Sequence, residues 1–239
     1  MDNEPARRQH ICKRFDQELE DIRNRALTMG GLVERQVEDA LKSVLNNDVE
    51  LGERIILNDI NVNALEVSID EECTQILVRR QPAAVDLRVV VAVIKTITDL
   101  ERIGDEAKRI ARQTIDMAGH YCKKNQFLDL QHLGHHVIQL LHKSLDAFAR
   151  LDVDLAVNAV QDDRKVDSEY ESIIRQQMTY MMEDPRTIPA SIDIMWAARA
   201  LERIGDRACN ICEYVIYQVK GKDVRHTKLE DIESEFKTQ

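Results

Sequence analysis

The sequence predicts an all-α protein built from two tandem three-helix bundles. The first observation is a hexapeptide that occurs twice: Leu-Glu-Arg-Ile-Gly-Asp at residues 100–105 returns unchanged at residues 201–206. The second is composition, because charged residues make up 32% of the chain and there are only 8 Gly and 4 Pro, which is typical of long helices. An internal repeat indicates one duplicated supersecondary unit, so we expect equivalent elements in the two halves.

The first half contains three stretches with apolar residues at helical spacing. They predict helices at about residues 7–45, 49–78 and 83–118. The Gln81-Pro82 dipeptide should end the second helix, because the residue before a proline disfavours the α conformation. We therefore expect the first three-helix unit at residues 7–118.

The second half repeats this plan. Helices are predicted at residues 133–151, 153–182 and 189–220, with Gly221 as the cap of the last. Asp48-Val49-Glu50-Leu51 also matches Asp152-Val153-Asp154-Leu155, which supports duplication. The prediction is six long helices with a pseudo-twofold internal repeat, a second unit at residues 125–221 and a charged tail at residues 222–239.

Each hexapeptide carries two acidic residues on one helix face. Glu101 and Asp105 are four positions apart, as are Glu202 and Asp206, and like charges at this spacing repel. Gly104 also weakens the helix by roughly 1 kcal/mol relative to alanine, and we expect it to let a neighbouring helix or a ligand approach closely. Carboxylates beside an apolar interior require a cation, which is either Arg or Lys from a partner or a metal ion.

Further oxygen-bearing side chains follow the second and fifth predicted helices. In an antiparallel bundle they can face the acid pairs of the third and sixth helices, forming two oxygen-lined sites suited to Mg²⁺, Mn²⁺, iron or Zn²⁺. The alternative is a solvated acidic face. The candidate metal ligands are Glu101, Asp105, Glu202, Asp206, Asp59, Asp163, Asp167, Asn63, Glu66 and Glu171.

Other patterns argue against several kinds of active site. The Glu-x-x-His signature of di-iron bundles is missing from both copies, and the sequence has no glycine-rich phosphate loop or nucleophile elbow. His132 and His136 have metal-ligand spacing, although a surface patch is the favoured interpretation. Cys209 and Cys212 are interpreted as small core residues of a helix.

Composition limits the partners and the compartment. A formal net charge of −10 and 4% aromatic residues oppose nucleic-acid binding. Five scattered cysteines, a polar start and the lack of about 20 consecutive apolar residues predict a soluble cytoplasmic protein.

Several segments together resemble one known family. They are the two hexapeptides, Gln81-Pro82-Ala83 with Asp86-Leu87-Arg88, Met182-Glu183-Asp184-Pro185-Arg186, and Asn210-Ile211 followed by Glu213-Tyr214-Val215. This set resembles the PhoU family of bacterial accessory and regulatory proteins of phosphate-specific transport. The resemblance covers residues 15–221, nearly the whole chain.

The resemblance implies two three-helix bundles, a homodimer, and iron or zinc clusters at the two acid pairs, with no organic cofactor. Asp59, Asp163 and Asp167 fit the family pattern, whereas Asn63 is a weaker ligand and Tyr170 stands where the first copy has Glu66. The implied function is non-enzymatic.

The family represses the phosphate-starvation response by linking the ATPase of the phosphate ABC importer to a sensor histidine kinase. This chain would then reach the membrane only through partners. The alternatives are a metal-dependent helical-bundle enzyme, a metal-storage protein and a purely structural bundle.

Overall fold

The computed structural model describes residues 13–122, 126–225 and 227. Within these ranges the chain forms six long α-helices and one short 3₁₀-helix that precedes the last of them. The elements are α1 (Lys13–Asn46), α2 (Val49–Arg80), α3 (Val85–Asp116), α4 (Leu128–Arg150), α5 (Val153–Glu183), η1 (Pro185–Thr187) and α6 (Ile188–Lys220). The predicted start of the first helix at residues 7–12 and most of the predicted tail lie outside the described residues.

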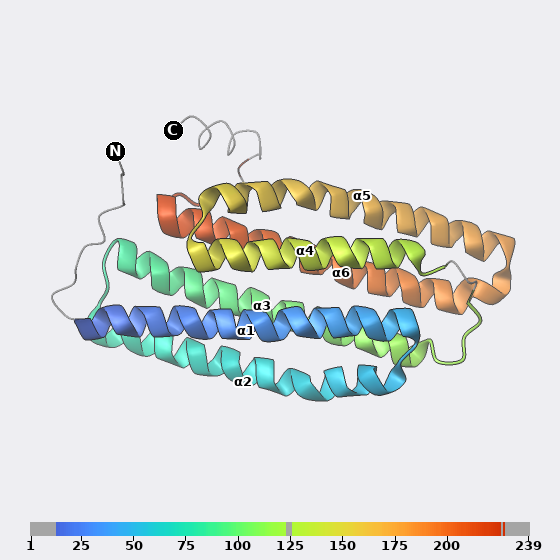
Figure 1. Cartoon of the computed structure of the whole chain (residues 1–239), viewed down its shortest axis with the longest axis horizontal. Coiled ribbons are helices and arrows are strands. Elements are labelled where there is room, and N and C mark those ends of the chain that lie inside the picture. Colours follow the sequence, from blue (N-terminus) through green and yellow to red (C-terminus); the bar gives the residue numbers. More distant parts are fainter. Residues whose placement is uncertain (1–12, 123–125, 226, 228–239) are drawn as a thin grey trace.

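The architecture is all-α, as the sequence predicts. In Figure 1 the helices follow the long axis of the molecule, with α1–α3 in one half and α4–α6 in the other. Helix α4 begins at Leu128 rather than at the predicted residue 133. The reason is that Leu130 is fully buried, so the apolar stripe of α4 starts one turn earlier.

The helix ends confirm the expected repeat in chemical detail. Asp48 accepts a hydrogen bond from the backbone N–H of Leu51 at the start of α2, and Asp152 accepts one from Leu155 at the start of α5. Such caps satisfy backbone donors that have no partner inside the helix. Gly221, with φ of 74°, ends α6 in the left-handed conformation that glycine adopts most easily.

Helices α3 and α6 pack against each other and also against the other helices of their own halves. The apolar residues of both hexapeptides are fully buried there. Removal of this apolar surface from water stabilises the central packing. The arrangement places each acid pair at the edge of the central core, next to α2 in the first half and next to α5 in the second.

Candidate functional site

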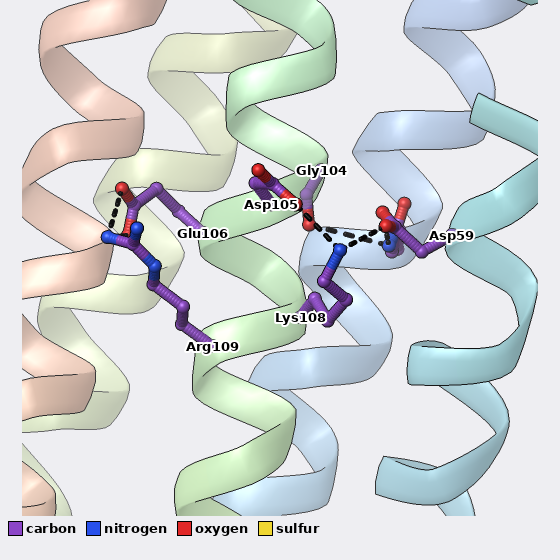
Figure 2. Close-up of polar contacts among 7 residues, drawn as sticks. Asp59, Gly104, Asp105, Glu106, Lys108 and Arg109 are labelled. Carbon is purple, nitrogen blue, oxygen red and sulfur yellow. Dashed lines mark hydrogen bonds and ion pairs between the residues drawn. The ribbon is translucent and has the colours of Figure 1, made fainter. Parts of the chain in front are cut away.

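In the first repeat, a lysine of the protein itself pairs with two of the acidic residues. Lys108 on α3 donates hydrogen bonds to Asp59 Oδ2 at 2.5 Å and to Asp105 Oδ1 at 2.7 Å. Gln36 on α1 donates to the other oxygen of Asp59 at 3.1 Å. Figure 2 shows the Lys108 ammonium between the two aspartates, which come from different helices. Asp59 is only 3% exposed, so these partners replace the water that it loses on burial.

The remaining candidates of the first repeat lie beside this group. The pKa of Glu101 is raised, first by partial burial and then by the nearby carboxylates Asp105, Glu66 and Asp59. Partial burial also raises the pKa of Glu66, with a contribution from Asp70. The side-chain oxygen of Asn63 is buried and accepts no hydrogen bond from the described residues.

The second repeat holds similar acids but no equivalent lysine. The position equivalent to Lys108 is Cys209, which is buried. Asp163, the counterpart of Asp59, has a buried Oδ1 that accepts no hydrogen bond within the part of the chain described. Burial raises the pKa of Asp163 to about 7, and the charges of Asp167 and Asp206 add to this effect. A hydrogen bond with the neighbouring Cys209 thiol lowers this pKa, but by less than burial raises it.

The acids around Asp163 also perturb one another. Burial raises the pKa of Glu202, and Asp206 and Asp167 raise it further. The pKa of Asp206 is raised by loss of hydration and by Asp167. Arg199 donates a 2.6 Å hydrogen bond to Oε1 of Glu202. The buried Oε2 of Glu202 accepts no hydrogen bond from the described residues. Glu171 lies apart from this group: it is exposed and pairs with Arg175 at 3.4 Å.

The glycine of each hexapeptide allows close approach of an aspartate from the adjacent helix. A Cβ atom at Gly104 would lie 3.4 Å from Asp59 Oδ1, and one at Gly205 would lie 3.0 Å from Asp163 Oδ1. The sequence-based expectation of close approach is therefore confirmed, with the neighbouring helix as the group that approaches. The approach is tight at Gly205, where an added Cβ would press on Asp163, and looser at Gly104, where it would make an ordinary contact with Asp59.

Sequence reasoning missed Lys108 and Gln36. Lys108 follows Asp105 by three positions, a spacing at which opposite charges on a helix attract, so a local signal was present. Gln36 gave no signal, because its contact with Asp59 depends on how α1 is rotated against α2.

The two repeats are also joined by buried polar contacts between α3 and α6. Asp99, 2% exposed, accepts hydrogen bonds from Tyr214 at 2.7 Å, Arg207 at 3.3 Å and Asn210 at 3.4 Å. Glu106 accepts from Arg109 of its own helix at 3.0 Å and from Arg203 of α6 at 3.2 Å. Each carboxylate thus receives donors from the opposite repeat. These contacts fix how the two halves are oriented.

The predicted metal ligands are brought together within each repeat, but their side chains do not converge on one point. Among the described residues, no group of three or more His, Cys, Asp and Glu side chains has an arrangement that could hold a metal ion. His136 instead contacts Glu169 at 2.7 Å, and His142 contacts Glu34 at 2.8 Å. Cys209 and Cys212 are both buried, which agrees with their interpretation as core residues.

The donor sets of the two repeats differ in how well they fit a metal ion. In the second repeat, Asp163 and Glu202 each keep a buried oxygen without a donor among the residues described, which is the type of atom that a cation satisfies. In the first repeat both oxygens of Asp59 are already bonded.

No helix in the described ranges has the length and apolar character needed to span a membrane.

Comparison with known proteins places this arrangement in a family. The model of the PhoU domain matches residues 26–114 and 130–215, one match in each repeat. The phosphate-specific transport system accessory protein PhoU of Serratia marcescens is 52% identical over 217 residues, covering 91% of this chain and 89% of that protein. The protein of the same name from Escherichia coli (strain K12) is 51% identical over 219 residues, covering 91% and 90%.

Solved structures show the same fold. The crystal structure of PhoU from Pseudomonas aeruginosa superposes with a TM-score of 0.84 at 48% identity, covering 87% of this chain and 100% of that one. The crystal structure of the phosphate transport system regulatory protein PhoU from Streptococcus pneumoniae gives a TM-score of 0.81 at 28% identity, covering 88% and 99%. The names describe accessory and regulatory proteins rather than enzymes. With a domain match in each repeat and about half of its residues shared with full-length relatives, the chain belongs to the PhoU family.

Proposed function

We propose that this chain is an accessory protein of phosphate-specific transport that represses the phosphate-starvation response. It acts as a cytoplasmic adaptor between the ATPase of the phosphate importer and the sensor histidine kinase. The observation that carries this proposal is the identity of about 50% over more than nine-tenths of the chain with accessory proteins of phosphate-specific transport. The family is non-enzymatic, so the chain is not an enzyme, and the alternative of a metal-dependent enzyme is set aside.

One surface of the molecule supports an adaptor role. Leu57, Ile60 and Val67 lie on one side of α2 at helical spacing and are 73%, 70% and 56% exposed. Large apolar side chains that gather on a monomer surface are typical of a protein interaction site. We propose that this outer side of α2 contacts a protein partner, either the kinase, the ATPase or a second copy in a homodimer.

Binding is tested with the full chain immobilised and the purified cytoplasmic part of the kinase, or the purified ATPase, passed over it. We expect retention of both partners, and at least tenfold weaker retention of one of them by the variant Leu57→Ser with Ile60→Ser. Met182→Ser is the matched control, because Met182 is 79% exposed on α5. Failure to retain either partner at any phosphate or metal concentration would contradict the adaptor proposal.

We also propose that a metal ion fixes helix positions at the carboxylate clusters, without taking part in bond chemistry. Iron, zinc, manganese and magnesium all bind carboxylate oxygen, and the ligands would come from the acids of α2, α3, α5 and α6 named above. Because these side chains do not converge in the structure, they would have to reorient around the ion. The test is elemental analysis of untagged protein purified without chelator, beside a variant with Glu101, Asp105, Glu202 and Asp206 all changed to alanine. A stoichiometric metal that the variant loses supports the proposal, and two metal-free proteins contradict it.

A purely structural bundle makes a different prediction in the cell. It would tolerate Glu101→Ala with Glu202→Ala and keep normal regulation. Constitutive expression of phosphate-starvation genes in that strain, with normal amounts of the variant protein, would exclude the structural alternative.

A further inference from the structure

A small hollow between α3 and α6 is lined by four arginines. It has a volume of about 190 Å³ and lies where the two repeats meet. Arg109 and Arg112 come from α3 and are three positions apart, while Arg199 and Arg203 come from α6 and are four positions apart. Each pair therefore shares one face of its helix. The lining is completed by Glu106, Gln113, Trp196 and Ala200.

This hollow is separate from the acid group of the first repeat. Figure 2 shows Glu106 and Arg109 on one side of α3, and Asp59 and Lys108 on the other. The arginines therefore do not take part in the pairing of Lys108 with its two aspartates.

The arginines of the hollow outnumber the carboxylates bonded to them. Glu106 accepts hydrogen bonds from Arg109 at 3.0 Å and from Arg203 at 3.2 Å. Arg199 donates to Glu202 at 2.6 Å. Two carboxylates thus serve four guanidinium groups, which leaves an excess of two positive charges in a chain whose net charge is −10.

Donor groups of these arginines remain available to a ligand. The side chain of Arg112 is exposed and forms no hydrogen bond or ion pair with any residue in the described ranges. In Arg109 and Arg203, the bonds to Glu106 use only the Nη1 atom. Because a guanidinium group carries five N–H donors in a planar fork, most of the donors around the hollow have no carboxylate partner.

The charge of the hollow favours a phosphoryl group as its ligand. Guanidinium forks match the oxygens of phosphate in pairs, and this geometry makes arginine a preferred residue for phosphate recognition. A phosphoryl group carries a charge of about −1.5 to −2 at pH 7, whereas a carboxylate carries only one. The excess of two positive charges therefore matches a phosphoryl dianion better than a carboxylate.

The size of the hollow limits how much of a ligand it can hold. One water molecule needs about 10–15 Å³ of such a volume, so there is room for an ion of five heavy atoms. Pockets that enclose a whole organic ligand begin at about 300 Å³. A larger group attached to the phosphorus would therefore extend out of the hollow, where the side chain of Trp196 is 61% exposed.

We infer that this hollow binds a phosphoryl group between Arg109 and Arg112 of α3 and Arg203 of α6. The ligand joins the two repeats from the surface, as Glu106 joins them from below. Its source is either free inorganic phosphate or the phosphate of a nucleotide whose base stacks on Trp196. The inference goes beyond the adaptor role and does not depend on it or on metal binding.

The test uses Trp196 as a reporter, because it is the only tryptophan of the chain. The full-length protein is titrated with sodium phosphate, AMP or adenosine at constant ionic strength, with sodium chloride as the blank. We expect a saturable change in fluorescence with phosphate, with a dissociation constant of about 1 mM or below. The melting temperature should rise over the same range, because the ligand binds only the folded state. Adenosine, which lacks the phosphate, should give neither change.

The comparison of phosphate with AMP distinguishes the two sources. Equal or weaker binding of AMP identifies free phosphate as the ligand. Binding of AMP that is at least tenfold tighter identifies a nucleotide, and Trp196→Ala, measured by calorimetry, should then remove the difference. A difference that Trp196→Ala leaves unchanged would overturn the placement of the base.

Substitution of Arg112 tests the assignment of the site. Arg112→Gln should weaken phosphate binding at least tenfold and leave the melting temperature of the free protein unchanged, because Arg112 has no described partner to lose. Arg112→Lys should restore only part of the affinity, since lysine keeps the charge but lacks the planar fork. Arg54→Gln is the matched control, because Arg54 is also exposed but lies on α2, outside the lining.

Two results would overturn the inference. The absence of a saturable response to phosphate and AMP up to about 10 mM, ten times the expected constant, would show that the four arginines are solvated surface charges. Equal affinities of Arg112→Gln and Arg54→Gln for phosphate would show a general attraction to positive charge. Either result leaves the adaptor proposal standing, because that proposal is tested by partner retention.

Discussion

Leu41 of α1 packs directly against Gly134 of α4, and the equivalent pair of the other repeat, Leu145 and Gly30, makes the same contact in reverse. A Cβ atom at Gly134 would lie 2.5 Å from Leu41 Cδ1, and one at Gly30 would lie 2.6 Å from Leu145 Cδ2. Each residue is 104 positions from its counterpart. The outer helices of the two halves therefore meet through a pseudo-symmetric pair of leucine side chains, each seated over a glycine.

This contact predicts opposite effects for two adjacent glycines. Gly30→Ala should lower the free energy of unfolding by about 1–3 kcal/mol, because the added methyl group overlaps the packed Leu145 side chain. Gly31→Ala should be neutral or raise it by up to about 1 kcal/mol, since nothing described lies within 4 Å of its added Cβ. Urea denaturation of both variants measures the difference. Equal effects of the two substitutions would contradict close packing of Leu145 against Gly30.

The hydrogen bond between Tyr214 and Asp99 should make a large contribution to the contact between the repeats. Burial and the adjacent Asp99 carboxylate raise the pKa of Tyr214, so its hydroxyl stays protonated as a donor. Tyr214→Phe should cost about 1.5–3 kcal/mol in the free energy of unfolding, the range for hydrogen bonds to charged groups. Tyr217→Phe is the control, because Lys95 lies 5.4 Å from the centre of both rings. A loss below about 0.5 kcal/mol for Tyr214→Phe would contradict a large contribution from the hydrogen bond between Tyr214 and Asp99.

Lys108 should stabilise the metal-free protein. Lys108→Met leaves Asp59 Oδ2 in a buried position without its charged partner, and we expect a loss of about 3 kcal/mol in the free energy of unfolding. Lys143→Met removes an exposed ion pair and should cost less than about 1 kcal/mol. Both are measured by denaturation in the presence of a chelator. Similar losses for the two variants would show that the Asp59 contact is no stronger than a surface pair.

Glu213 should make stability depend on pH. Its pKa in the folded protein is raised from 4.5 to about 7, first by burial and then by Asp223. Between these two values the folded state binds more protons than the unfolded state, so this group lowers stability as the pH rises through the window. Glu213→Gln should therefore match the wild type near pH 4 and exceed it by about 1–2 kcal/mol near pH 8.

The measurement is the free energy of unfolding by urea at both pH values. Glu53→Gln on the exposed side of α2 is the control for removal of a glutamate carboxylate. A Glu213→Gln variant that is less stable than the wild type near pH 8 would mean that the charged form of Glu213 is favoured in the fold.

Much of the fold could be predicted from the sequence because helices are specified by local information. The spacing of apolar residues predicted all six helices, and the Asp48 and Asp152 caps repeat at equivalent turns. The close approach at Gly104 was also predictable, since a glycine in the core-facing stripe of a helix leaves room for a neighbour. The error at the start of α4 came from placing its boundary inside a segment where Leu130 already faces the core.

The candidate site was predictable only in part. The acids of each repeat lie on adjacent helices, as predicted, but the side chains that bond them were not predicted. Lys108 was close in sequence to Asp105, but its contact with Asp59 joins α3 to α2. Glu171 follows Asp163 by eight positions on α5, which rotates its direction by about 80° around the helix, and it is exposed and pairs with Arg175.

By itself the sequence determined the helices, their order, the duplication and the family. These properties depend on residue periodicity and on a repeated motif, both of which are local. Only the tertiary structure decided that Lys108 pairs with both Asp59 and Asp105, that Asp163 and Glu202 keep buried oxygens without a described donor, and that Asp99 is bonded from the opposite repeat. Such contacts depend on how each helix is rotated and shifted along its neighbour. Those two variables are set by packing of the whole core, which no single helix encodes.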